Sequence, residues 1–227
     1  MNIGLLVIAT GKYNCFIVPL ITSARQHFLK NHKVTYYIFT DDFALLARET
    51  DDVIPIPKEH KPWPHATLSR YETFHQSTKT LAQEDYLFYC DADMLFVSAV
   101  GDEILGDRVS TIHPGFMGQR GTPEARSESL AYVAPHENMT YFAGGFNGGT
   151  SKNFLEMSRI IAHNIEIDMK NDIIAIWHDE SHMNRYFIDN SPTTILSPSY
   201  CYPESWDLPC ERKLLALDKN HKEIRGK

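Results

Sequence analysis

The first 90 residues of the chain alternate between apolar runs and mixed segments. Residues 3–9 form an unbroken apolar run, which is typical of a strand buried on both faces. The pattern then predicts a helix over 16–29, a strand over 34–39, a helix over 67–83 and a strand over 86–90. Strands that alternate with helices predict an α/β fold with a mostly parallel sheet flanked by helices.

The pattern in the rest of the chain is less regular. It predicts a strand over 110–113 and helices over 153–167 and 179–188. From residue 191 the chain is rich in proline and aromatic residues, and it closes in a basic tail over 216–227. No long linker or internal repeat interrupts it, so we expect a single domain.

Composition narrows the class of protein. In 227 residues, 43% hydrophobic and 22% charged residues are ordinary values for a soluble globular protein, and a net charge of −7 argues against a nucleic-acid or anionic-membrane surface. The N-terminal apolar run is too short to span a membrane and has no basic segment before it. Four cysteines without C-x-x-C spacing fit a reduced cytosol, so we expect a cytoplasmic protein.

Polar clusters follow the predicted strands at residues 10–13, 41–42 and 91–93, where the ligands of parallel sheets bind. In the last of these, a strand delivers Asp91 and Asp93 with one small residue between them. Hard divalent cations such as Mg²⁺ and Mn²⁺ take carboxylate oxygens together with substrate phosphates. The pair therefore suggests a metal that bridges the protein to a diphosphate, and two solvated acids at a strand end are the alternative.

A glycine-rich stretch covers residues 141–151, YFAGGFNGGTS. Glycine lets the backbone approach a ligand closely. The stretch matches neither a dinucleotide fingerprint nor a phosphate loop. By itself it favours a turn and a bulge before the next helix over a ligand-binding segment.

The stretch IWHDESH places His178 and His182 four residues apart, as in some zinc sites. The metallopeptidase motif needs glutamate directly after the first histidine, whereas Glu180 comes one residue later and would point about 100° away around a helix. A zinc hydrolase is therefore a poor fit. Asp179 and Glu180 fall in the first turn of a predicted helix, which favours ionised carboxylates. Ordinary capping by Asp179 leaves Trp177 and both histidines unexplained.

Two basic features have both simple and functional interpretations. Arg70 lies on a predicted helix and could pair bidentately with a carboxylate or phosphate, or it could be a surface arginine. The basic tail is either a solvated end or a flexible segment that closes over a bound phosphate group.

Taken in order, the motifs ATGKY, DAD, HPGF, AGGFNGG, WHDESH, SPSYCYP and KNHKEIR resemble glycosyltransferase family 6, which includes the blood-group A and B transferases and the α-1,3-galactosyltransferase. The likeness covers nearly the whole chain, and WHDESHMNRYF with SPSYCYP is its most specific part. The chain lacks the anchor and stem of the animal enzymes, so it looks like a soluble bacterial or phage-type member. The resemblance implies a GT-A-type, Rossmann-like fold and retaining transfer from a UDP-sugar to the 3-hydroxyl of a β-galactoside, for example a fucosylated one, in an α-1,3 linkage.

The resemblance also implies roles for individual residues. Residues 1–95 would form a nucleotide-binding half in which the uridine is held by Ile8, Ala9, Thr10 and Tyr13. Asp91 and Asp93 would bind Mn²⁺, or alternatively Mg²⁺, and the tail would close on the diphosphate through Lys219 and Arg225.

The second half, residues 96–215, would bind the donor sugar and the acceptor. The donor sugar would be contacted by Arg70, Ala143, Gly144, Gly145 and Asp179, or Arg70 would instead orient Asp91. Glu180 would be the catalytic carboxylate, and His113 and Trp177 would contact the acceptor. Because Gly145 has no Cβ, it leaves room for an acetamido group, which favours UDP-GalNAc over UDP-Gal by only ~1–3 kcal/mol.

Two departures from the family pattern affect these expectations. Many bacterial members carry asparagine in place of both acids and work without metal, so Asp91 and Asp93 predict metal dependence here. The animal pattern FTYERR appears as TPEAR at residues 122–126, which weakens inferences about the acceptor. A nucleotide-sugar-binding protein without transfer activity and, less well, a zinc hydrolase are the alternatives.

Overall fold

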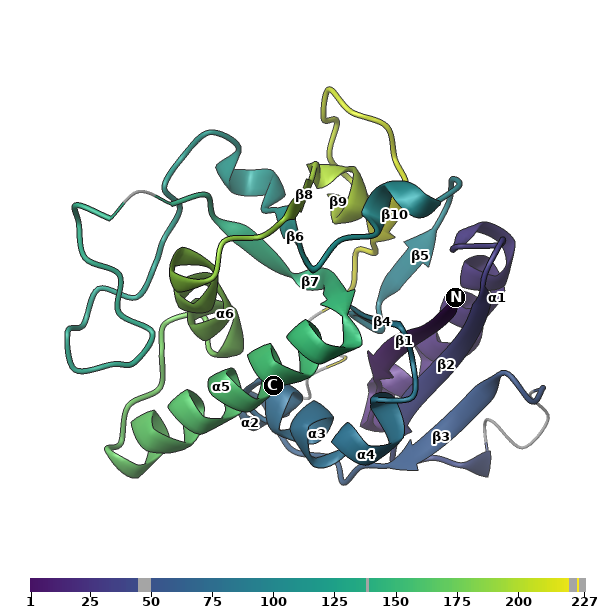
Figure 1. Ribbon diagram of the computed structural model, residues 1–227, viewed down its shortest axis with the longest axis horizontal. Helices are drawn as coiled ribbons and strands as arrows, with labels where there is room; N and C mark the ends of the chain where they lie inside the picture. The colour runs from purple at the N-terminus through teal and green to yellow at the C-terminus, as the bar shows by residue number, and fades with distance from the viewer. Residues whose placement is uncertain (45–49, 138, 221–223, 225–227) are drawn as a thin grey trace.

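The computed structural model describes residues 1–44, 50–137, 139–220 and 224. A central sheet lies between two layers of helices (Figure 1), with strand order β3-β2-β1-β4-β7-β6-β8. The strands are β1 Asn2–Ile8, β2 Lys33–Thr40, β3 Val53–Pro57, β4 Tyr86–Cys90, β6 Arg108–Ile112, β7 Phe142–Thr150 and β8 Thr194–Leu196. Only β7 runs antiparallel to its neighbours in this sheet. The α/β fold with a mostly parallel sheet is thus confirmed.

The two helical layers follow from the alternation of side chains along the strands. On β1, Ile3 and Leu5 pack into the core beneath α1 (Ile17–His27), while Leu6 faces the opposite core. That second core is closed by α3 (Arg70–Gln76), α5 (Ser151–Lys170) and α6 (Asp179–Asp189). Both faces of the strand are buried, which explains its continuous apolar sequence.

The helix predicted over 67–83 is in fact three short helices, α2 (His65–Leu68), α3 and α4 (Thr78–Leu81). Ser69 and Ser77 stand at the breaks, with φ and ψ of −86° and 3°, and −93° and 9°. Ser69 Oγ donates back to the Ala66 carbonyl at 3.4 Å. Such local side-chain hydrogen bonds compete with the backbone hydrogen bonds of a helix. The segment therefore keeps the apolar spacing of one helix but is divided into three. The helix predicted over 16–29 is α1, and a 3₁₀ helix, η1 (Gly11–Phe16), comes directly before it.

The glycine-rich stretch is strand β7, and the predicted turn is wrong. A Cβ on Gly148 would lie 2.3 Å from Phe88 Cδ1 and 2.6 Å from the Leu87 carbonyl, so glycine is required by the close packing of β4. The predicted bulge is present, because consecutive residues Ser110 and Thr111 of β6 pair with Asn147 and Ala143. The residues between these partners bow away from β6, and their backbone groups are available to other partners.

A small second sheet returns the C-terminal segment to the carboxyl end of β4. It contains β5 (Met94–Phe96), β10 (Leu214–Ala216) and β9 (Tyr202–Pro203). Beyond β10, the Leu217 amide donates to the Asp93 carbonyl at 2.9 Å. The remaining elements are the 3₁₀ helices η3 Asp102–Ile104, η4 Pro114–Phe116 and η5 Pro198–Tyr200. In the described part of the chain, no helix combines the length and apolarity that a membrane span needs.

Candidate active site

The polar clusters predicted at the carboxyl ends of the strands do meet. The Gly11 amide after β1 lies 3.0 Å from both carboxylate oxygens of Asp41 after β2, and Asn14 donates to the same carboxylate at 2.8 Å. This contact fixes the first turn of η1 against the end of the neighbouring strand. Gly11 and the next residues of this turn line a pocket of about 360 Å³.

The pocket collects most residues predicted for the nucleotide and the metal. It is lined by Ile8, Thr10, Tyr13, Arg70, Asp91, Asp93 and Lys219. Ala9 is fully buried behind it, and its amide donates to the Phe39 carbonyl at 2.9 Å. Arg225 lies outside the described residues. His60 and Trp63 also line the pocket, although no motif pointed to them.

The Asp91/Asp93 pair has the character of a cation site. Asp93 is buried and forms an ion pair with the ammonium group of Lys219. Asp91 accepts a hydrogen bond from Tyr89 and pairs with Arg70 at 3.2 Å. Among the described residues, no group of three or more His, Cys, Asp and Glu side chains could hold a metal. Two carboxylates open to a pocket suit Mg²⁺ or Mn²⁺ completed by ligand oxygens, and do not suit a closed zinc site.

Arg70 links this pair to the start of α6. Its side chain is 9% exposed, and it donates to the Gly144 carbonyl at 2.9 Å. Its Nε lies 3.0 Å from Asp179 Oδ2, and its guanidinium lies 4.3 Å from the centre of the Tyr89 ring. Burial raises the pKa of Asp179 to about 6, against the opposing charge of Arg70. The surface interpretation of Arg70 is therefore wrong.

Glu180 is held by two donors at the bulge in β7. Its carboxylate accepts from the Gly144 amide at 2.8 Å and from the Tyr141 hydroxyl at 3.0 Å. Burial raises its pKa to about 7, although both hydrogen bonds favour the ionised form. Near neutral pH this group can act as an ionised carboxylate beside a developing cation or as a nucleophile. No spacing rule had singled out Tyr141, which directly precedes the glycine-rich strand.

The two histidines of the WHDESH stretch have separate environments. His178, not Asp179, is the N-cap of α6; its φ is 53°, and its ring lies 4.8 Å from that of Trp63. His182 is buried, with Nε2 3.4 Å from Asp168 Oδ2, and burial lowers its pKa to about 4. The two rings therefore serve different contacts, and the zinc hydrolase alternative loses its structural basis.

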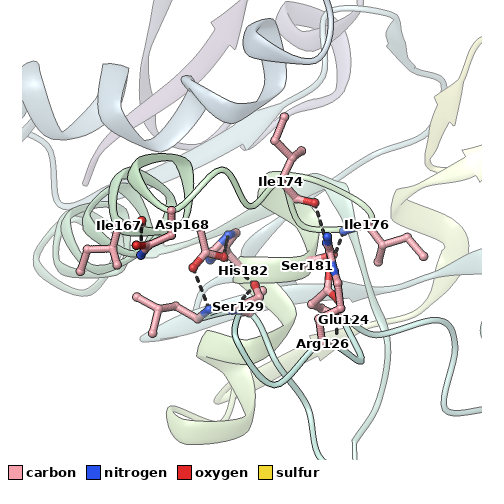
Figure 2. A network of polar contacts seen from close by, with 12 residues as sticks. Glu124, Arg126, Ser129, Ile167, Asp168, Ile174, Ile176, Ser181 and His182 are labelled. Atoms are coloured by element: carbon pink, nitrogen blue, oxygen red, sulfur yellow. Dashed lines mark hydrogen bonds and ion pairs between the residues drawn. The ribbon is translucent and has the colours of Figure 1, made fainter.

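A buried clamp joins the TPEAR segment to the residues before α6 (Figure 2). Glu124, which is 3% exposed, accepts from the Ile176 amide at 2.8 Å and from the guanidinium of Arg126. Arg126 also donates to the Ile174 carbonyl at 2.6 Å. The indole Nε1 of Trp177 donates to Thr122 at 2.7 Å. The sequence departure at 122–126 thus fixes the backbone and the ring at Trp177.

A second contact anchors the same loop farther along. Asp168, at the end of α5, accepts from Ser129 Oγ at 2.5 Å and from the Leu130 amide at 2.9 Å. The oxygen that accepts from Ser129, Oδ2, also lies 3.4 Å from His182 Nε2 (Figure 2). The loop is therefore attached to α5 and to the start of α6.

We expect Glu124→Gln to lower the free energy of unfolding by about 1–3 kcal/mol, because charge-assisted bonds to Arg126 and the Ile176 amide are lost in a buried site. The bond from Arg126 lowers the pKa of Glu124 to about 2. This stabilisation is present above the unfolded pKa near 4.5 and is lost as pH falls towards 2. Urea unfolding at pH 7 and pH 4 measures it.

The matched control is Glu156→Gln, which breaks a similar pair with Arg159 on the exposed side of α5. Exposed pairs contribute only about 0–1 kcal/mol. If both substitutions lowered the free energy of unfolding equally, the buried clamp would contribute no more to stability than an exposed ion pair.

His113 and Tyr141 belong to an aromatic cluster next to Glu180. His113 Nδ1 accepts from the Gly115 amide at 3.1 Å, and its ring lies 5.7 Å from that of Tyr141 and 4.9 Å from that of Phe116. Both this cluster and the exposed Trp177 are linked to the first turn of α6. The cluster is linked through the hydrogen bond from Tyr141 to Glu180. Trp177 is linked through its backbone amide, which donates to Ser181 Oγ at 3.0 Å.

The glycines of the bulge lie against the acidic groups. A Cβ on Gly144 would be 3.3 Å from Glu180 Oε2, and one on Gly145 would be 3.2 Å from Asp91 Oδ2 and 3.3 Å from Cys201 Sγ. Ala143 is buried in the same strand. The absence of a side chain at Gly145 therefore matters for the position of Asp91 as well as for free space.

Comparison with known proteins gives a consistent result. The model of glycosyltransferase family 6 matches residues 1–226. Globoside α-1,3-N-acetylgalactosaminyltransferase 1 of Gallus gallus is 36% identical over 240 residues, covering 100% of this chain and 70% of the relative. Histo-blood group ABO system transferase 1 of Rattus norvegicus is 35% identical, covering 99% and 69%. O-antigen biosynthesis glycosyltransferase WbnI of Escherichia coli is 28% identical, covering 100% and 98%.

Proposed function

Because this chain belongs to glycosyltransferase family 6 and is a hexosyltransferase, we propose that it transfers GalNAc from UDP-GalNAc to the 3-hydroxyl of a β-galactoside, with retention and in an α-1,3 linkage. The observation that carries the proposal is the unit built on Arg70. This side chain contacts Asp91, Asp179 and the Gly144 carbonyl, so a cation site and the catalytic candidate Glu180 form one rigid assembly.

The pocket at the ends of β1 and β4 is the proposed UDP site. Its volume of about 360 Å³ lies within the range of small-ligand pockets. The side chains of Ile8, Thr10 and Tyr13 would hold the uridine from residues 1–95, and Lys219 and Arg225 of the tail would neutralise the diphosphate. The second half, 96–215, would hold the donor sugar and the acceptor.

Asp91 and Asp93 would hold Mn²⁺, or Mg²⁺ in its place. When bound, the metal would stabilise the negative charge that develops on the leaving diphosphate. The ammonium group of Lys219 pairs with Asp93, so a metal bound there would displace this group, which could then turn to the diphosphate.

In the transfer step, the bond between the anomeric carbon and the diphosphate oxygen breaks and the electron pair leaves with UDP. The anomeric carbon becomes cationic, and ionised Glu180 would stabilise it or attack it. Asp179, held by Arg70, would bond to the donor sugar. The acceptor hydroxyl forms the new glycosidic bond and gives its proton to the departing phosphate oxygen, so no separate base is required.

The preference for GalNAc rests on Gly145 and on the similarity to an N-acetylgalactosaminyltransferase. To test the proposal, the protein is incubated with UDP-GalNAc or UDP-Gal, with Mn²⁺, against fucosylated and unfucosylated β-galactosides. We expect an α-1,3-linked product, with GalNAc preferred. UDP binding by calorimetry without turnover on any acceptor would instead favour a nucleotide-sugar-binding protein.

We expect EDTA to abolish transfer and Mn²⁺ to restore it, because Asp91 and Asp93 provide the carboxylates that a hard cation needs. Asp93→Asn should weaken Mn²⁺ binding in calorimetry with UDP present and lower transfer by about 10²-fold or more. Glu166→Gln, a change at an exposed acid on α5 that pairs only with Lys170, is the control. Full activity in chelator would rule out the metal assignment.

A further inference from the structure

Trp206 is a large apolar side chain that the proposed transfer step does not use. It lies in the loop after β9, the yellow-green loop at the top of Figure 1, and it is 45% exposed. Burying the exposed part of an indole would be favourable, because apolar surface gains roughly 25 cal/mol per Å² when it leaves water. A ligand that covers the Trp206 ring would therefore gain free energy from the contact.

The loop holds Trp206 in a defined place. The Trp206 amide donates to the Pro203 carbonyl at 3.1 Å, and its own carbonyl accepts from Arg212 at 3.1 Å. The guanidinium of Arg212 lies 4.9 Å from the centre of the Tyr202 ring, and the Tyr202 hydroxyl accepts from the Leu208 amide at 2.6 Å. An exposed ring on a fixed backbone loses little conformational entropy when a ligand binds to it.

The ring also continues the aromatic cluster beside Glu180. A Cβ on Gly115 would lie 3.7 Å from Trp206 Cη2 and 3.4 Å from the ring of His113. His113 contacts Tyr141, and the Tyr141 hydroxyl donates to Glu180. Gly115 thus lies between the rings of His113 and Trp206, and the buried ring of Tyr141 connects His113 to the catalytic carboxylate.

His113, which is half-buried, provides a polar group of defined direction beside Trp206. Burial lowers the pKa of His113, so the ring is neutral near pH 7. Its Nδ1 accepts from the Gly115 amide, so the proton of the neutral ring is on Nε2, which can donate to a sugar hydroxyl. A donor next to the exposed ring of Trp206 suits a pyranose, which has a C–H face and hydroxyls on its edge.

We propose that Trp206 is the platform for the acceptor's second sugar, the residue linked to the galactose that receives the transfer. This inference rests on the proposed function. It makes Trp206 a specificity-determining residue that distinguishes oligosaccharides from monosaccharides. The reacting galactose lies nearer Glu180 and Trp177, so its own binding does not depend on the Trp206 ring.

The test compares methyl β-galactoside with lactose as acceptors for the wild type, Trp206→Ala and Trp206→Phe. For lactose, Trp206→Ala should lower kcat/KM by about 10-fold, mainly through KM, which corresponds to about 1.4 kcal/mol. Trp206→Phe should lower kcat/KM for lactose by less than Trp206→Ala does, because it keeps an aromatic ring. For methyl β-galactoside all three proteins should agree within about 2-fold. Met169→Ala, an exposed apolar change on α5, is the control.

Two results would overturn the inference: no loss of kcat/KM for lactose in Trp206→Ala, or an equal loss for lactose and methyl β-galactoside. Binding of lactose in the presence of UDP, followed by saturation-transfer NMR, gives a readout without turnover. If the wild type transfers to neither acceptor, the proposed function fails, whereas loss of lactose binding in Trp206→Ala would still support the platform. Unchanged lactose binding in that variant would refute it.

Discussion

Replacing Glu180 by glutamine is expected to lower the rate of transfer by at least about 10²-fold while UDP binding survives. The amide keeps the size of the side chain but cannot carry the negative charge that the cationic anomeric carbon requires. The Gly144 amide and the Tyr141 hydroxyl both donate to this carboxylate, so an acceptor oxygen is needed at each position. Initial rates and calorimetric UDP titration measure the two effects separately.

The raised pKa of Glu180 gives this prediction a pH dependence. Because the pKa is about 7, kcat/KM of the wild type should rise as pH increases through 7 and then level off. The stability contribution has the opposite direction. A raised pKa stabilises the folded state fully below the unfolded pKa of about 4.5, and this contribution is lost as pH rises through about 7. Relative to the wild type, Glu180→Gln should therefore become more stable as pH rises from 5 to 8.

Glu166→Gln, on the exposed side of α5, is the control for both measurements, because Glu166 only pairs with Lys170 at the surface. Transfer by Glu180→Gln at the wild-type rate would remove Glu180 from the mechanism. A profile of kcat/KM without a rise near pH 7 would show that another group controls the reaction.

Arg70→Ala is expected to cost about 3–5 kcal/mol of folding free energy, because removing one partner of a buried ion pair leaves the other charges uncompensated. Asp179 is 3% exposed and would keep only backbone donors, and Asp91 would lose its closest positive charge. For a chain of this size the change corresponds to a fall in Tm of about 10 °C. Thermal unfolding at pH 7 measures it.

Arg70→Lys separates charge from geometry. It keeps the positive charge but loses the planar fork that reaches the Gly144 carbonyl and both acids, so we expect a smaller loss of stability together with a large loss of transfer. Arg159→Ala removes an exposed arginine from α5 and serves as the control. A wild-type unfolding midpoint for Arg70→Ala would contradict the view that Arg70 holds the site together.

The same two residues show how far sequence reasoning reached. The sequence alone identified Arg70 and Glu180 as candidate site residues, and the resemblance suggested their functions. It did not identify their shared partner Gly144, which lies 74 residues after Arg70 and 36 residues before Glu180. The hydrogen bonds form only where the bulge in β7 turns the Gly144 backbone away from β6, and the sequence indicated the bulge but not its neighbours.

The sequence by itself determined the α/β class, the buried strand β1 and the position of the acids at the end of β4. Each follows from local apolar runs whose period and length fit a strand or a helix. Only the tertiary structure decided the rest. Whether residues 142–150 form a turn or a strand depended on packing against Phe88 in a distant strand. The approach of Lys219 to Asp93, the clamp at Glu124 and the place of Trp206 beside Gly115 all depend on long-range contacts. Such contacts follow from how the chain closes on itself, which no local pattern specifies.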